Sequence, residues 1–144
     1  MLLRVLTFIT LVAASLSGQA ATTVYQKPSE FIRSACGGRI PSTRMLTLTA
    51  AHQDRIKRLL GHAYRPSRVR YWTSGSRMVV ILDEIGKTQP ITTGFVLREG
   101  KIEQVKLLIY RETIGAETRG TSFTNQFKGV TLGSNGKLSR RINN

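Results

Sequence analysis

Hydrophobic residues follow a helical spacing in the first half of the chain. Between Thr49 and Gly61, the apolar residues Ala51, Ile56, Leu59 and Leu60 lie near helical spacing. Thr49 can cap the start of this helix, and Gly61 can end it. A shorter helix is predicted over residues 28–36, because Pro28 suits a first helical turn and the glycine pair at 37–38 stops the helix. The pattern therefore predicts two helices before residue 62.

The spacing changes to that of β-strands from Arg68 onward. Residues 68–72 alternate between polar and apolar side chains, and in the segment 77–82 an apolar, largely β-branched run follows Arg77. Two further strands, over residues 91–97 and 102–110, flank Glu99-Gly100, where glycine supplies the positive φ of a tight hairpin turn. We expect an α+β fold, with two N-terminal helices followed by an antiparallel sheet.

The first 20 residues have the organisation of a secretory signal peptide. A short leader containing Arg4 precedes an apolar stretch over residues 5–16, and small residues lead up to Ala20. This stretch is shorter than the roughly 20 residues that a membrane-spanning helix needs. We expect cleavage after Ala20 and a periplasmic or otherwise exported protein, with an N-terminal helical region over residues 21–75 and a second region over 76–144.

The chain is strongly basic, with 22 Lys and Arg against 8 Asp and Glu and a formal net charge of +14. Removing the leader takes away one charged residue, Arg4, so the mature chain remains strongly basic. Nucleic acid is the usual partner of such charge, but the predicted compartment favours anionic lipid or a phosphate-bearing cofactor. A single Cys cannot form an internal disulfide, and one Cys with two His provides few ligands for a metal site. The chain also lacks the Gly-x-Ser-x-Gly elbow that would indicate a hydrolase.

An ordered series of short motifs runs from residue 82 to residue 130. Its members are Leu-Asp-Glu-Ile-Gly-Lys at 82–87, Ile-Thr-Thr-Gly-Phe-Val at 91–96, Arg-Glu-Thr-Ile-Gly at 111–115 and Phe-Thr-Asn-Gln-Phe-Lys-Gly at 123–129. The series resembles the FMN-binding domain of the flavin-bearing subunits of sodium-pumping NADH:quinone reductase and Rnf complexes. The mature chain also resembles exported, stand-alone members of this family, which share stretches like Gly-His-Ala-Tyr at 61–64 and Val-Arg-Tyr-Trp at 69–72.

The resemblance implies FMN as cofactor and a membrane redox complex or a cytochrome as electron partner. In this family FMN is joined through its phosphate to a threonine of an Asp-x-Ile-Ser-Gly-Ala-Thr motif by a flavin transferase. Here Asn143 stands where the family has Asp, and the Ser-Gly-Ala-Thr part is absent. We expect either a fragment or a natural short form, without covalently retained flavin. Noncovalent binding would then depend on ring stacking, phosphate charge and backbone hydrogen bonds.

The resemblance also suggests which side chains contact the flavin. Thr and Gly at the first stretch suit close approach to a ring, an amide in the second can contact polar ring atoms, and basic groups suit the phosphate. The cofactor-binding candidates are Arg111, Glu112, Thr113, Gly115, Gln126, Phe127 and Lys128. The same residues also fit an ordinary strand-ending turn, a core phenylalanine and solvated surface charges.

Two functions follow from these observations. The first is a periplasmic FMN-binding electron carrier, rather than a substrate-specific enzyme, in which the chemistry belongs to the flavin. The second is a cofactor-free basic module that binds anionic lipid or a partner protein.

The leader gives a direct prediction about export. When the gene is expressed in a Gram-negative bacterium, the intact mass of the periplasmic product should correspond to a chain that begins at Ala21. Accumulation of the chain in the cytoplasm with its first 20 residues intact would contradict the assignment of a signal peptide.

Overall fold

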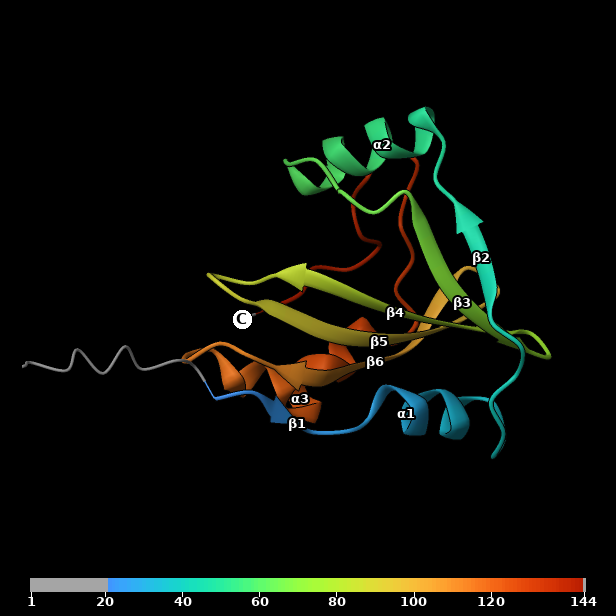
Figure 1. Ribbon diagram of the computed structural model, residues 1–144. Helices are drawn as coiled ribbons and strands as arrows, with labels where there is room; N and C mark the ends of the chain where they lie inside the picture. The colour runs from blue at the N-terminus through green and yellow to red at the C-terminus, as the bar shows by residue number, and fades with distance from the viewer. Residues whose placement is uncertain (1–20, 144) are drawn as a thin grey trace, which may run out of the picture.

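The computed structural model of the chain describes residues 21–143 (Figure 1). The strands are β1 (Thr23–Val24), β2 (Arg44–Thr47), β3 (Arg68–Ser74), β4 (Arg77–Ile85), β5 (Pro90–Arg98) and β6 (Lys101–Tyr110). The helices are α1 (Pro28–Ala35), α2 (Ala50–Leu60) and α3 (Thr121–Thr124), and two 3₁₀ turns, η1 (Ala116–Arg119) and η2 (Asn125–Phe127), flank α3. The predicted α+β class is confirmed.

All six strands form one antiparallel sheet in the order β1-β6-β5-β4-β3-β2. The hairpin between β5 and β6 turns at Glu99 and Gly100, whose φ angles of 52° and 76° are both positive. Such a pair of angles matches the right-handed twist of the flanking strands, which confirms the predicted turn. Strands β1, β2 and β3 belong to the predicted N-terminal region over residues 21–75, and β4, β5 and β6 belong to the region over 76–144, so one sheet includes both regions.

Both predicted helices are present with the expected ends. Helix α2 begins after Thr49, whose hydroxyl accepts from the backbone N–H of His52. The His52 ring in turn accepts from the Thr49 N–H, which completes a reciprocal cap. The helix ends at Gly61 with a φ of 78°, as expected of a C-terminal glycine.

The predicted order of elements was wrong in one respect: strands begin before the helices are complete. Strand β1 precedes α1, and β2 lies between the two helices. Strand β1 has only two residues, too few to show a period. All four residues of β2 are exposed, so its sequence lacks the apolar alternation of a half-buried strand.

The core lies between α1 and one face of the sheet. Phe31 and Ile32 of α1 are buried against Val79, Val96 and Leu108, which come from β4, β5 and β6. Phe31 lies directly over Gly94 of β5: a Cβ built on this glycine would come 2.5 Å from the ring atom Cε1. The absence of a side chain at residue 94 thus lets the helix approach the sheet closely.

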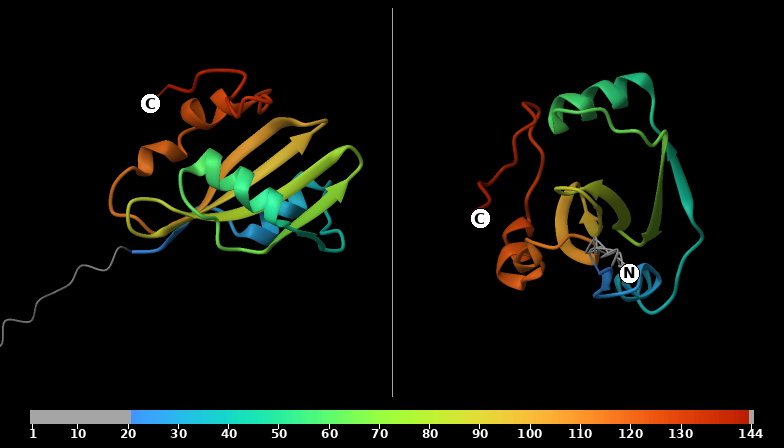
Figure 2. Two further views of the ribbon diagram at one scale, coloured as in Figure 1. Left: turned by 90° about the horizontal axis from the view of Figure 1, so that it is seen from above. Right: turned by 60° about the vertical axis from the view of Figure 1, so that its left-hand side comes forward.

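The opposite face of the sheet has a different kind of cover. Helix α2 lies above this face at one end, beyond the upward curve of β2 and β3, and the C-terminal segment descends beside it (Figures 1 and 2). The short helix α3 and the turn η2 lie alongside β6. Unlike α1, neither α2 nor α3 has a buried residue.

No helix within residues 21–143 has both the length and the apolar character needed to cross a bilayer.

The contact between Gly94 and Phe31 predicts a specific sensitivity to substitution. Gly94→Ala should lower the free energy of unfolding by about 1–3 kcal/mol, because the added methyl overlaps the Phe31 ring. Denaturant unfolding of Gly94→Ala, Phe31→Ala and the double variant measures the effect. In the double variant the overlap is gone, so the two losses should not add. Simple additivity would contradict the contact.

Candidate functional site

A hollow of about 240 Å³ lies on the face of the sheet opposite α1, here called the open face. It lies between strands β5 and β6 and the α3–η2 segment. Its walls are apolar and aromatic, and no charged side chain lines it. The residues that form most of the wall are Phe95, Val105, Leu107, Thr118, Phe123 and Phe127. An apolar concavity of this kind suits the face of a planar ring system better than a charged group.

The strands supply the floor of the hollow through their register. Phe95 pairs with Val105, and Thr93 pairs with Leu107. Directly opposed residues of antiparallel strands project from the same face, so these four side chains lie together. The alternation within β5 and β6 indicates which side chains of each strand share a face. Only the pairing of the two strands shows that these four side chains form one surface.

The α3–η2 segment supplies the aromatic wall. Phe123 and Phe127 are four residues apart, and their rings meet edge to face with centroids 5.6 Å apart and an interplanar angle of 74°. This arrangement places the positive edge of one ring against the negative face of the other. Phe127, one of the predicted flavin contacts, therefore lines the hollow next to a side chain that stabilises its orientation.

The loop after β6 reaches the same hollow. Gly115 has a φ of 88° and begins η1, and the Tyr110 hydroxyl donates to the backbone carbonyl of Ile114. Thr118 lines the hollow and donates its hydroxyl proton to the Gly115 carbonyl at 2.8 Å. Of the two stretches singled out in the sequence, only 123–129 lines this hollow. The stretch 111–115 is linked to it by the hydrogen bond from Thr118 to Gly115, and sequence reasoning missed Thr118.

Glu112 serves the turn between β4 and β5 instead of the hollow. Its carboxylate accepts hydrogen bonds from the backbone N–H groups of Thr88 and Gln89, at 2.6 and 2.9 Å, and from the Thr88 hydroxyl at 2.9 Å. These bonds, led by those from the Gln89 and Thr88 N–H groups, lower the pKa of Glu112. Gly86 leaves room for the carboxylate, since a Cβ there would lie 2.8 Å from Oε1.

Arg111 is also engaged within the protein. Its guanidinium donates to the Pro90 carbonyl at 2.9 Å and to the Thr92 hydroxyl at 3.1 Å. Thr92 in turn donates to the carboxylate of Asp83. Thr113 is exposed in the loop that follows. Arg111 and Glu112 together therefore tie the end of β6 to the β4–β5 turn.

Gln126 binds the C-terminal segment. Its amide nitrogen donates to the Asn143 carbonyl at 3.0 Å, and its amide oxygen accepts from the Asn143 N–H at 2.8 Å. Lys128 lies elsewhere, in a shallow hollow of about 310 Å³ that Arg98 and Lys101 also line. Of the seven candidates, only Phe127 lines the aromatic hollow, while Gly115 reaches it indirectly through Thr118.

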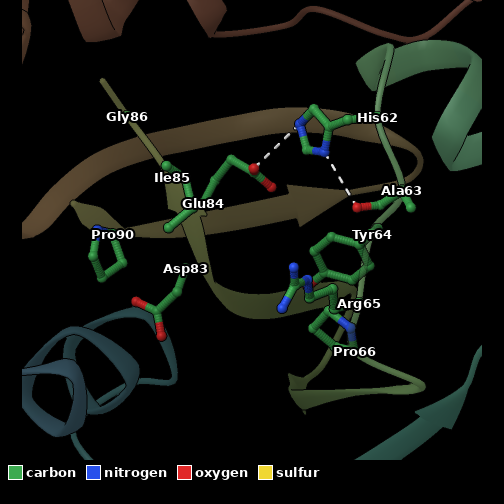
Figure 3. A pocket seen from close by; sticks show the side chains of 10 residues that line it. All are labelled: His62, Ala63, Tyr64, Arg65, Pro66, Asp83, Glu84, Ile85, Gly86 and Pro90. Atoms are coloured by element: carbon green, nitrogen blue, oxygen red, sulfur yellow. Dashed lines mark hydrogen bonds and ion pairs between the residues drawn. The ribbon is translucent and has the colours of Figure 1, made fainter. Parts of the chain in front are cut away.

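A more polar hollow of about 450 Å³ lies at the far end of β4 (Figure 3). The His62 ring and the Glu84 carboxylate face each other across it, with 3.4 Å between Nε2 and Oε1. The Tyr64 ring lies below this pair. Burial raises the pKa of Tyr64, and the carboxylates of Glu84 and Asp83 raise it further. In the part of the chain that the structure describes, no three His, Cys, Asp or Glu side chains form a metal-binding group.

Comparison of the chain with protein families, with curated proteins and with solved structures gives no match.

The bonds to Glu112 predict a pH-dependent contribution to stability. Its pKa in the folded protein lies below the value of about 4.3 for an unperturbed glutamate, so the charged form stabilises the fold above that pH. Glu112→Gln should lower the midpoint of thermal unfolding at pH 7, and the difference from wild type should vanish as the pH falls through the lowered pKa.

Glu117→Gln is the matched control, because Glu117 is exposed. Equal unfolding midpoints for Glu112→Gln and Glu117→Gln at pH 7 would contradict the assigned role of the Glu112 carboxylate.

Proposed function

We propose that this chain is an exported flavin-binding domain that carries electrons for a membrane redox system, with the aromatic hollow as the flavin site. The observation that supports the proposal is that one family-like stretch, 123–129, forms the aromatic wall of a concave surface, while Thr118 of the same wall is hydrogen-bonded to Gly115 at the end of the other stretch. The aromatic wall suits contact with the flat isoalloxazine ring system. Bound flavin supplies reversible electron transfer.

The residues present fit the ring better than they fit the phosphate. Phe123, Phe127 and Phe95 offer apolar and aromatic contact, and the hydroxyls of Thr118 and Thr124 are the polar groups within reach. The donor capacity of both hydroxyls goes to backbone carbonyls, of Gly115 and Gly120 respectively, so each would act toward a ligand as an acceptor. Because no charged side chain lines the hollow, a phosphate would lie at its rim or in solvent.

The composition of the wall also favours an electron carrier over a substrate-specific enzyme. None of the residues that line the hollow carries a group that exchanges protons near neutral pH. General acid and base catalysis needs such a group within hydrogen-bond reach of the reacting atom. The protein's part would be to hold the ring, to exclude water from one of its faces and to leave an edge accessible to a redox partner.

A titration with riboflavin, followed by quenching of flavin fluorescence, tests the proposal. Phe127→Leu keeps the apolar volume but removes the aromatic ring, and it should weaken binding by about 2- to 10-fold, the value of one aromatic contact. FMN should bind at least as tightly as riboflavin because the domain is basic, and any advantage from its phosphate should fall as the salt concentration rises.

Tyr71→Leu is the matched control, since Tyr71 is a half-buried aromatic residue of β3 that does not line the hollow. Failure of riboflavin to bind, or equal losses in Phe127→Leu and Tyr71→Leu, would contradict the flavin site.

A further inference from the structure

A second apolar groove, of about 410 Å³, lies on the same face of the sheet beneath α2. Strands β3, β4 and β5 form its floor, and α2 with the following segment forms its roof. Its wall includes Ile56, Leu59, Leu60, Val69, Val80 and Leu82. The one charged residue that lines it is Glu84, whose carboxylate is paired with His62 in the neighbouring polar hollow (Figure 3). The groove therefore offers an almost wholly apolar interior.

Helix α2 does not close this groove by packing. None of its residues is buried, and Leu59 and Leu60 remain 41% and 44% exposed although they face the groove. A hydrogen bond of 2.8 Å from the Gln53 amide to the Pro66 carbonyl joins the helix to the following segment, and Leu59 lies close to Gly136 of the C-terminal segment. Exposed apolar surface that lines a groove marks a binding site more often than a core.

Cations border the apolar side of α2. At about 100° of rotation per residue, Ile56, Leu59 and Leu60 share one side of the helix. The same geometry places Arg55 at one margin of that side and Lys57 at the other. Both are exposed, and their long side chains can keep their charges in water at the groove lips while the stems cover apolar surface.

The neighbouring edge of the sheet adds a further cation. Arg44 and Leu46 of β2 pair with Tyr71 and Val69 of β3, so they belong to the same face as the groove wall. Arg44 is exposed, and Leu46 is 47% exposed. The apolar floor thus continues past the groove toward a positive margin.

We propose that this groove binds a long-chain fatty acid, with the acyl chain beneath α2 and the carboxylate at one of the two lips, beside Arg55 or Lys57. The volume lies at the low end of the range of about 300–1,000 Å³ for small-molecule sites, which suits one chain rather than the two of a phospholipid. A second copy of this basic protein would bring like charge to the same lip. An anionic amphiphile matches both the interior and its rim.

Titration with cis-parinaric acid, an intrinsically fluorescent fatty acid, tests the site at concentrations below micelle formation. Leu60→Glu places a negative charge in the groove wall and should weaken binding by at least 10-fold. Leu138→Glu is the matched control: Leu138 is also 44% exposed but does not line the groove, so this variant should bind as wild type does. Circular dichroism establishes that both variants are folded.

The charge at the lip is tested separately. The double variant Arg55→Glu/Lys57→Glu should weaken parinaric acid binding by at least 10-fold, whereas Arg58→Glu, on the outer side of α2, should change it less than 3-fold. Oleyl alcohol should displace the probe more weakly than oleate does. Because Phe127 does not line this groove, Phe127→Leu should leave fatty-acid binding unchanged even if it abolishes flavin binding.

Three results would overturn the proposal. The first is an absence of parinaric acid binding at micromolar protein. The second is equal binding by wild type and Leu60→Glu. The third is retention on phosphatidylglycerol vesicles, by wild type and Leu60→Glu alike, without binding of the monomeric fatty acid, since this would show a basic surface and no groove site.

Discussion

The close approach of Phe31 to Gly94 determines how the rest of the molecule is arranged. It seats α1 on the middle of the sheet, where Phe31 and Ile32 complete the core with side chains from β4, β5 and β6. The other face of the same strands is also apolar, but it receives no comparable helix. Its cover comes from α2, from the short α3–η2 segment and from the C-terminal segment. One-sided packing thus leaves concave apolar surface on the other face of the sheet.

The two hollows on that face are neighbours with different chemistry. Both use Thr93 and Phe95 of β5. Toward β6, the wall becomes aromatic and carries no charge. Toward β3, the wall is aliphatic, and α2 brings cations to its border. A ring ligand and a chain ligand would therefore occupy neighbouring parts of one surface, with Thr93 and Phe95 shared between them.

Several residues that the sequence suggested as cofactor contacts form hydrogen bonds within the protein instead. Glu112 fixes the β4–β5 turn, Arg111 ties β6 to Pro90, and Gln126 holds the backbone of Asn143. Such contacts determine where Gly115, Thr118 and Phe127 lie, and hence the shape of the hollow. Residues that suggest a binding motif in the sequence can thus serve the fold instead.

Local signals predicted much of the fold but only part of the site. The caps at Thr49 and Gly61 and the turn at Glu99-Gly100 depend on neighbouring residues, so the sequence contained them. The exposed strand β2 carries no apolar period, and its pairing with β3 is a tertiary property. The motif at 123–129 suggested Phe127 only as one of seven candidates and after Gln126, whereas the structure places Phe127 in the wall of the hollow. Phe95 becomes a wall residue only when β5 and β6 pair in register.

An NMR titration of the ¹⁵N-labelled protein with riboflavin tests most directly the claim that the open sheet face is the flavin-binding face. The account predicts amide shift changes concentrated at Thr118, Phe123, Phe127 and the adjoining residues of β5 and β6, with little change in α1. Shift changes confined to the basic surface of α2 and β3, or none at millimolar riboflavin, would contradict it.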